Sequence, residues 1–174
     1  MSLSPSQRLA SIDDLLLYRL GRLSSTAGAL VVRLCEGGYG ITRREWAVVA
    51  QLYENGGLPP SVLAERMHRD RARTSRILTA LVKKQLVLRT VTPGDRRGAR
   101  VELMPAGRQL YDDLMPSIQA INGQILSALQ ADEVVQFDDV LARLQARAQS
   151  LVVELSPHWP RANRRRGPLS RSPG

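Results

Sequence analysis

The sequence predicts a mainly α-helical protein with one small β-hairpin. Only 4% of the 174 residues are aromatic, and Val and Ile do not dominate the apolar residues, so helix packing is favoured over a large sheet. Apolar residues recur every three to four positions over long stretches, which is the period of an amphipathic helix. The period changes to simple alternation only within residues 86–103, where a hairpin is expected. A chain of this length can bury a real core.

The first predicted helix covers residues 12–34, and Glu36-Gly37-Gly38 ends its pattern. Its apolar positions are Ile12, Leu15, Leu16, Leu20, Leu23, Ala27, Leu30, Val31 and Leu34. This stripe is wide enough to need partners on more than one side, as in a dimer interface. Arg19 lies on the same apolar side, and a buried arginine must find an anion. That anion is either an acid of the core or partner subunit, or the carboxylate of a ligand.

Two shorter helices are expected next. The first begins at the capping box Thr42-Arg43-Arg44-Glu45 and ends by Asn55-Gly56-Gly57. Its inner face carries Trp46, Val49, Ala50 and Tyr53. Pro59-Pro60 starts the second, which runs to Met67, because proline is well accepted in a first helical turn. A tight turn follows.

The helix expected at residues 70–84 combines an apolar and a basic face. The apolar face carries Thr74, Ile77, Leu78 and Leu81, and the other face carries Arg73, Arg76, Thr79 and Lys83. Asp70 is placed as its N-cap. Arginine can donate two parallel hydrogen bonds to guanine, and a helix fits the major groove, although a solvated surface helix has the same pattern. Together with the preceding helix it predicts a helix-turn-helix.

A basic hairpin follows this motif directly. Residues 86–92 and 99–103 read as strands, and residues 93–98 between them read as a turn. Arg96 and Arg97 lie in this turn. Arginine at such a tip can enter the narrow minor groove, whereas a basic turn without a neighbouring helix-turn-helix would be a solvated loop. The hairpin is therefore expected to be a wing.

From Pro105 the helical repeat returns, with a break near Gln130-Ala131-Asp132 before a last helix. These helices and the first one are expected to form a second lobe. The predicted domains are residues 1–10 as a flexible N-terminus, 11–36 and 105–157 as a helical dimerisation lobe, 41–104 as a winged helix-turn-helix lobe, and 158–174 as a basic disordered tail.

The formal net charge of +9 is concentrated in two places. Residues 69–100 hold ten Lys or Arg against two acids, and the tail from Arg161 adds five arginines and no acid. A patch plus a tail of this kind indicates a polyanionic partner, with nucleic acid as the first candidate.

The sequence disfavours several other classes of protein. The apolar runs fall far short of the roughly 20 residues that span a membrane, and the N-terminus lacks a secretory signal, so a soluble cytoplasmic protein is expected. The single cysteine, Cys35, excludes an intramolecular disulfide. His68 and His158 lie too far apart in sequence to indicate a zinc site, and no cofactor is expected. No Ser/His/Asp set, glycine-rich phosphate loop or positioned pair of carboxylates indicates an enzyme.

Two segments resemble the MarR family of bacterial transcriptional regulators. LAERMHRDRARTSRILTALVKKQLVLR is similar to the family's helix-turn-helix, and PGDRRGARVELMPAGRQL is similar to its wing, with the Asp-x-Arg pattern at Asp95 and Arg97. The likeness covers roughly residues 10–155 and is most specific between 61 and 110. It implies a homodimer that binds a palindromic double-stranded operator and releases it when a small phenolic or aromatic acid binds between the lobes.

The resemblance and the residue pattern together predict two sites. Contacts to DNA are expected from Arg69, Arg71, Arg73, Ser75, Arg76, Thr79, Lys83, Asp95, Arg96 and Arg97. An effector pocket is expected to be lined by Tyr18, Arg19, Tyr39 and Trp46, because guanidinium suits a carboxylate and the aromatics supply ring contacts. The alternative is an architectural or virulence-type DNA-binding protein with no small-molecule effector and a filled space between its lobes.

The sequence departs from the family pattern at three positions. Gln85 stands where the family usually has a helix-ending glycine, and Met104 where it has a capping threonine, so both junctions are expected to bend differently. Cys35 lies at the end of the first helix, whereas the peroxide-sensing branch carries its cysteine near the start. An inert thiol is therefore favoured over a redox role.

Overall fold

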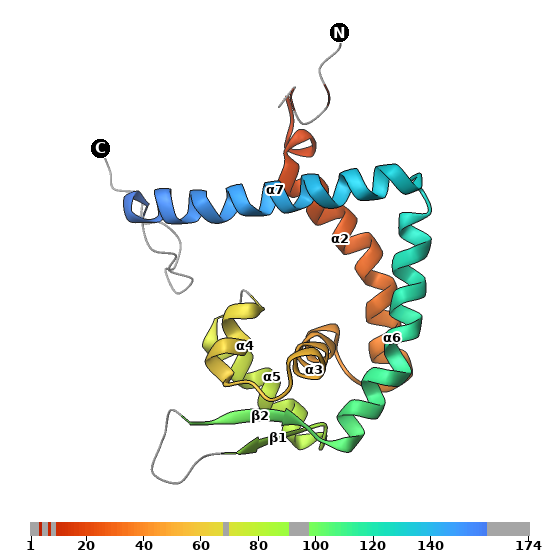
Figure 1. Ribbon diagram of the computed structural model, residues 1–174, viewed down its shortest axis with the longest axis vertical. Coiled ribbons are helices and arrows are strands. Elements are labelled where there is room, and N and C mark those ends of the chain that lie inside the picture. Colours follow the sequence, from red (N-terminus) through yellow and green to blue (C-terminus); the bar gives the residue numbers. More distant parts are fainter. Residues whose placement is uncertain (1–3, 5–6, 8–9, 68–69, 91–97, 160–174) are drawn as a thin grey trace, which may run out of the picture. The chain divides into compact units, whose positions relative to one another are not determined.

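The structure is a computed structural model that describes residues 4, 7, 10–67, 70–90 and 98–159 (Figure 1). The chain divides into two compact units, Met1–Ile125 and Leu126–Gly174. Within the described ranges, no helix is both long enough and apolar enough to cross a membrane.

The first predicted helix is interrupted. A short 3-10 turn, η1 (Ile12–Asp14), is followed by α2 (Leu16–Val32) and then by a π-helical segment, η2 (Arg33–Gly38). The prediction of one helix over residues 12–34 was wrong at Leu15, whose backbone is extended. The Asp14 carboxylate accepts the Ser11 backbone N–H at 3.1 Å and closes η1 as a separate turn. At its other end the helical backbone continues as η2 to Gly38, the last residue of the Glu36-Gly37-Gly38 segment that was expected to end the pattern.

The next three helices follow their capping signals. They are α3 (Arg43–Asn55), α4 (Pro60–Arg66) and α5 (Arg71–Lys83). At the start of α3, Thr42 and Glu45 exchange hydrogen bonds of 2.6 and 3.2 Å, as a capping box requires. Asp70 caps α5 by accepting the Arg73 backbone N–H at 2.8 Å. The expected helix-turn-helix is confirmed.

The core of the first unit forms around these helices. Its buried members include Val48, Val49, Leu52, Leu63, Leu78, Leu81, Val87, Val101, Leu103 and Leu114. The inner face expected for α3 is only partly correct, since Trp46 and Val49 are buried whereas Tyr53 is 36% exposed. On α5, the buried residues Thr74, Leu78 and Leu81 lie on the predicted apolar face, so the opposite face is left for solvent or a partner.

The hairpin consists of two antiparallel strands, β1 (Val87–Thr90) and β2 (Arg100–Leu103), with Val87 opposite Leu103. Leu58, in the loop between α3 and α4, exchanges two backbone hydrogen bonds of 2.9 and 3.0 Å with Val101. This pairing fixes the hairpin to the loop between α3 and α4. The strands were predicted to extend from 86 to 92 and from 99 to 103; residues 91–97 lie outside the described residues.

The junction between α5 and β1 keeps a left-handed turn despite its glutamine. Gln85 has φ +57°, the conformation for which glycine is favoured at a helix end. Its N–H bonds to Val82 O, and the Leu86 N–H bonds to Leu81 O, which are the two hydrogen bonds of a Schellman motif. The expectation of a different bend was therefore wrong here, because those two bonds hold Gln85 in a conformation that its Cβ disfavours.

The last elements of the described residues are two long helices, α6 (Pro105–Leu126) and α7 (Ala131–Leu155), and the 3-10 turn η3 (Ser156–His158). At the Met104 junction, the Met104 carbonyl accepts the N–H groups of Gly107 and Arg108 and starts α6 without a threonine cap. In the second unit, α7 is described along its whole length and has no buried residue.

Candidate nucleic-acid interface

The predicted DNA-contacting side chains that the structure describes lie together on the exposed face of α5. Arg71, Arg73, Ser75, Arg76, Thr79 and Lys83 are all exposed. The buried Thr74 and Leu78 hold the opposite face of the helix in the core. The remaining predicted contacts, Arg69, Asp95, Arg96 and Arg97, lie outside the described residues. We refer to α5 as the recognition helix from here on.

The first turn of the recognition helix orients Arg73. Asp70 caps the helix with one carboxylate oxygen, and its other oxygen lies 3.1 Å from Arg73 Nε. The side chains are about half exposed, at 51% and 48%. Because the ion pair uses Nε, the two terminal nitrogens of the guanidinium are left to face a ligand such as a base edge.

Arg76 and Thr79 make weaker or purely local hydrogen bonds. Arg76 Nε donates to Ala72 O at 3.4 Å, a long contact that restrains the side chain little. Thr79 Oγ1 donates to Ser75 O at 3.0 Å, so its hydroxyl proton is used within the helix and its oxygen remains available as an acceptor.

Two cavities flank the recognition helix, and their arginines extend its basic surface. One has a volume of about 560 Å³ and includes Arg71, Ser75 and Arg89 in its lining. The other has a volume of about 860 Å³ and is lined in part by Arg76 together with Arg43 and Arg44 of α3. The concave surface on both sides of α5 is therefore basic.

Arg43 and Arg44 were not predicted as part of this surface. They occupy the first turn of α3, directly after its N-cap Thr42. Cations are unfavourable at a helix N-terminus because the helix dipole is positive there. The sequence could have identified these two arginines as candidates for the basic surface, because helix stability alone does not favour cations at this place.

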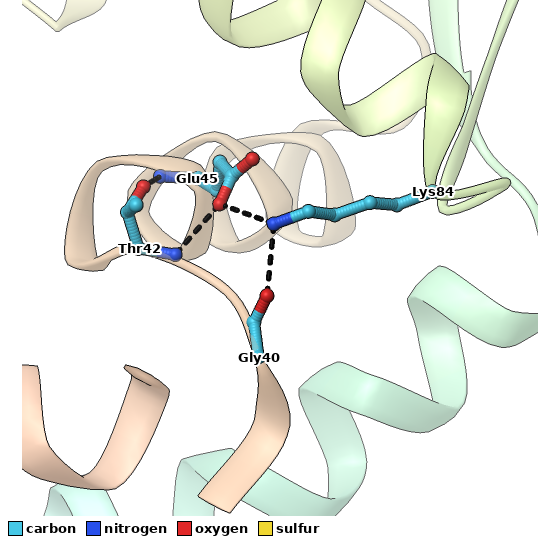
Figure 2. Close-up of polar contacts among 4 residues, drawn as sticks. All are labelled: Gly40, Thr42, Glu45 and Lys84. Atoms are coloured by element: carbon cyan, nitrogen blue, oxygen red, sulfur yellow. Dashed lines mark hydrogen bonds and ion pairs between the residues drawn. The ribbon is translucent and has the colours of Figure 1, made fainter. Parts of the chain in front are cut away.

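Lys84, the residue after the recognition helix, forms an ion pair with Glu45 of α3. Its Nζ lies 2.8 Å from Glu45 Oε2 and 2.9 Å from Gly40 O, and Figure 2 shows both contacts as dashed lines. The Glu45 side chain is only 4% exposed. Burial by itself raises the pKa of Glu45, but hydrogen bonds from Lys84 and from the Thr42 backbone N–H outweigh it, so the pKa is below the ordinary glutamate value. Glu45 is therefore held as a carboxylate.

The four predicted effector residues do not share one environment. Tyr18 is 52% exposed and lines a shallow apolar hollow on α2 with Leu17 and Gly21. Tyr39 donates from its hydroxyl to Asp113 O at 3.4 Å. Trp46 is buried and stacks on Tyr111 with ring centroids 5.4 Å apart, so its ring is a core contact.

Arg19 is exposed in the single chain, and its burial against a partner subunit or a ligand stays a prediction. The reason is that α2 packs on its own unit mainly near its C-terminal end, where Gly28 is its one buried residue. Cys35 is fully buried in the core, and burial raises the pKa of its thiol, as expected for an unreactive cysteine.

The exposed basic helix of a helix-turn-helix, joined directly to a short hairpin, defines a winged helix-turn-helix DNA-binding protein. The sequence profile of the MarR family matches residues 41–98. The HTH-type transcriptional regulator FarR of Neisseria gonorrhoeae is 30% identical over 104 residues, covering 60% of this chain and 71% of that protein. The chain belongs to the MarR family of transcriptional regulators.

Two further comparisons agree with this assignment. The HTH-type transcriptional repressor MdtR of Bacillus subtilis (strain 168) is 29% identical over 111 residues, covering 64% of this chain and 72% of that protein. The crystal structure of a probable transcriptional regulator from Pseudomonas aeruginosa is 30% identical and superposes with a TM-score of 0.67, covering 77% of this chain and 99% of that one.

Proposed function

We propose that the protein is a homodimeric repressor that binds a palindromic operator and is released by a small aromatic or phenolic acid. The observation that carries the proposal is the recognition helix, whose buried face fixes it in the core and whose opposite face presents arginines. A homodimer would place two such helices on the two halves of a palindrome. The relative MdtR, described as a transcriptional repressor, supports repression over activation.

The proposed dimer is supported by apolar side chains that each unit leaves exposed. On α7 they follow a four–three spacing through Phe137, Leu141, Leu144, Leu151 and Leu155, and each is between 36% and 41% exposed. This is the heptad spacing by which helices pack against one another. On α2, Leu23 and Leu30 are about half exposed. We propose that residues 11–36 and 105–157 form the dimerisation lobe.

The proposed DNA contacts fall into two classes. Arg73 and Arg76 are assigned to base edges in the major groove, with Ser75 and Thr79 beside them. Arg71 and Lys83 are assigned to phosphates at the two ends of the helix. The proposal gives phosphate and minor-groove contacts to Arg69, Arg96 and Arg97, with Asp95 orienting Arg97.

The proposed effector site combines Arg19 with Tyr18 and Tyr39. Arg19 is exposed, and its guanidinium suits a carboxylate, while the two phenol rings offer planar contacts. Trp46 remains part of the proposed lining, with its ring buried and stacked on Tyr111. The test is an Arg19→Ala variant, which should stay folded and dimeric and lose release of DNA by aromatic acids. An unchanged response would remove Arg19 from the site.

One observation favours the runner-up, an architectural or virulence-type DNA binder with no effector. The rings of Trp46, Tyr111 and Tyr53 form a continuous stack, with centroids 5.4 and 3.8 Å apart, and this stack fills space where aromatic rings could have received a ligand. Such a protein would bind DNA with the same helix and ignore aromatic acids.

The deciding experiment has two stages. Duplexes are first selected from a random library with the purified protein and sequenced, and a two-fold symmetric consensus is expected. A panel of aromatic and phenolic acids is then titrated into the complex with the selected duplex. A consensus without symmetry contradicts the dimeric operator, and a complex that no acid dissociates supports the runner-up.

A further inference from the structure

Glu45 is the only buried charged residue in the described part of the chain, and its cationic partner comes from the far end of the recognition helix. Glu45 lies in the first turn of α3, whereas Lys84 is the C-cap of α5, 39 residues later. The Lys84 side chain is 36% exposed, so the ion pair is open to water on the lysine side only.

Lys84 joins three segments of the first unit. Its ammonium donates to Glu45 Oε2 and to the Gly40 carbonyl, which belongs to the loop between η2 and α3. Glu45 Oε2 also accepts the Thr42 backbone N–H at 2.6 Å (Figure 2). Gly40 has φ +62°, a conformation suited to glycine, and its carbonyl is aimed at the lysine. We call Gly40, Thr42, Glu45 and Lys84 the clamp.

The clamp fixes geometry that apolar packing leaves loose. Leu78 and Leu81 anchor the recognition helix in the core, but apolar contacts are non-directional and allow small rotations and shifts. Hydrogen bonds from one ammonium to two fixed acceptors define the position of the helix end. A buried ion pair adds little net stability compared with apolar side chains, so its effect on geometry is the better reason for its presence.

We propose that Lys84 is a positioning residue for DNA binding, which holds the C-terminal end of the recognition helix on α3 and does not contact DNA. This inference rests on the proposed function. The neighbouring Lys83 is the natural comparison because it is exposed and makes none of the clamp contacts. Consecutive helix residues do not share a face, so the two lysines point to different surroundings.

The test compares Lys83→Met with Lys84→Met on a duplex selected by the wild-type protein and on its scrambled version, across a range of KCl concentrations. Lys83→Met should weaken the binding of both duplexes. The slope of log affinity against log salt concentration, here called the salt slope, should become shallower by about 0.9. Lys84→Met should keep the wild-type slope and bind the selected duplex roughly tenfold more weakly, with a smaller loss on the scrambled one. Lys84→Arg should stay within about twofold of wild type, since guanidinium can reach two acceptors.

Two results would overturn the clamp. If the salt slope of Lys84→Met is shallower than that of the wild type, as expected for Lys83→Met, then Lys84 is a phosphate contact. Wild-type affinity of Lys84→Met for both duplexes removes any positioning role. If Lys84→Met does not fold, Glu45→Gln carries the test: weaker binding of the selected duplex at the wild-type slope supports the clamp, and wild-type binding refutes it. A wild-type protein that selects no duplex at all contradicts the proposed function instead.

Discussion

Asp70 holds Arg73 in two ways: one carboxylate oxygen accepts its backbone N–H at 2.8 Å, and the other lies 3.1 Å from its Nε. The residue that starts the recognition helix therefore also orients the first arginine on its exposed face. A substitution can separate the capping role of Asp70 from its ion pair with Arg73, because asparagine caps a helix about as well as aspartate but carries no charge.

Asp70→Asn should therefore leave stability nearly unchanged and lower the ratio of operator to random-DNA affinity. Asp70→Ala should also lose the cap, which costs about 1 kcal/mol. Urea unfolding measures the first quantity, and paired titrations on operator and scrambled duplex at one salt concentration measure the second. An Asp70→Asn protein with the wild-type ratio would show that the ion pair has no part in recognition.

Substitution of Arg73 or Arg76 should affect DNA binding differently from substitution of Lys83. Arg73→Ala or Arg76→Ala should lose roughly 1–3 kcal/mol per half-site on the operator and relax the preference at one base position. Lys83→Ala should weaken operator and scrambled duplex alike, because a phosphate contact carries no sequence information. Equal losses on both duplexes for the two arginine variants would reassign base reading to neighbours such as Ala72, Ser75 or Thr79.

A charge among the apolar side chains at heptad spacing on α7 should separate the proposed dimer into monomers. Leu144→Asp places a charge among apolar side chains at heptad spacing, whereas Gln145→Asp places the same charge one residue away, off that spacing. Light scattering at micromolar concentration should give a mass near the 19.3 kDa of one chain for Leu144→Asp and twice that for Gln145→Asp. A wild-type protein that is itself monomeric would refute the dimer.

The helices around the site were predictable where their signals were local. Thr42 with Glu45, and Asp70 with the apolar repeat behind it, mark the starts of α3 and α5 within one turn of sequence. The exposed face of α5 follows from the same repeat. The basic first turn of α3 is also visible in the sequence, where Arg43 and Arg44 lie inside the capping box.

The remaining features depend on contacts between distant residues. Nothing near Lys84 in sequence indicates that its partner is Glu45, because the pairing depends on how α3 and α5 pack. Arg19 was predicted to be buried from its helical face alone, but burial depends on what covers that face, and the single chain leaves it exposed. The break at Leu15 results from a side-chain hydrogen bond that competes with the helix.

The backbone of Gln85 is strained, and a residue that removes this strain should stabilise the protein. Its φ of +57° costs a non-glycine residue roughly 1 kcal/mol. Gln85→Gly should therefore raise the free energy of unfolding in urea by up to about that amount. Gln119→Gly, at an exposed position inside α6, should lower it by about 1 kcal/mol, since glycine is a poor helix former. A destabilised Gln85→Gly variant would contradict the strain.

Two glycines of α6 should respond in opposite directions to alanine. A Cβ at Gly107 would lie 2.2 Å from the Leu86 carbonyl oxygen, so Gly107→Ala must push α6 away from the start of β1 and should cost about 1–3 kcal/mol. A Cβ at Gly123 meets nothing within 4 Å, and Gly123→Ala should gain about 0.5–1 kcal/mol. Thermal unfolding of both variants under identical conditions provides the comparison.

Removal of Lys84 should make the stability of the protein depend less on acid pH. In the wild type the pKa of Glu45 is below its ordinary value of 4.5, so the stability this carboxylate contributes is present above that value and is lost as the pH falls through the lowered one. In Lys84→Met, burial still raises the pKa of Glu45 while the lysine that lowered it is gone, so protonation begins at higher pH. Protonation of Glu45 therefore costs less native stability in Lys84→Met, and the free energy of unfolding in urea should fall less steeply from neutral to acid pH in this variant than in Lys83→Met, which leaves the pair intact. An equal pH dependence in the two variants would show that Lys84 does not hold the Glu45 charge.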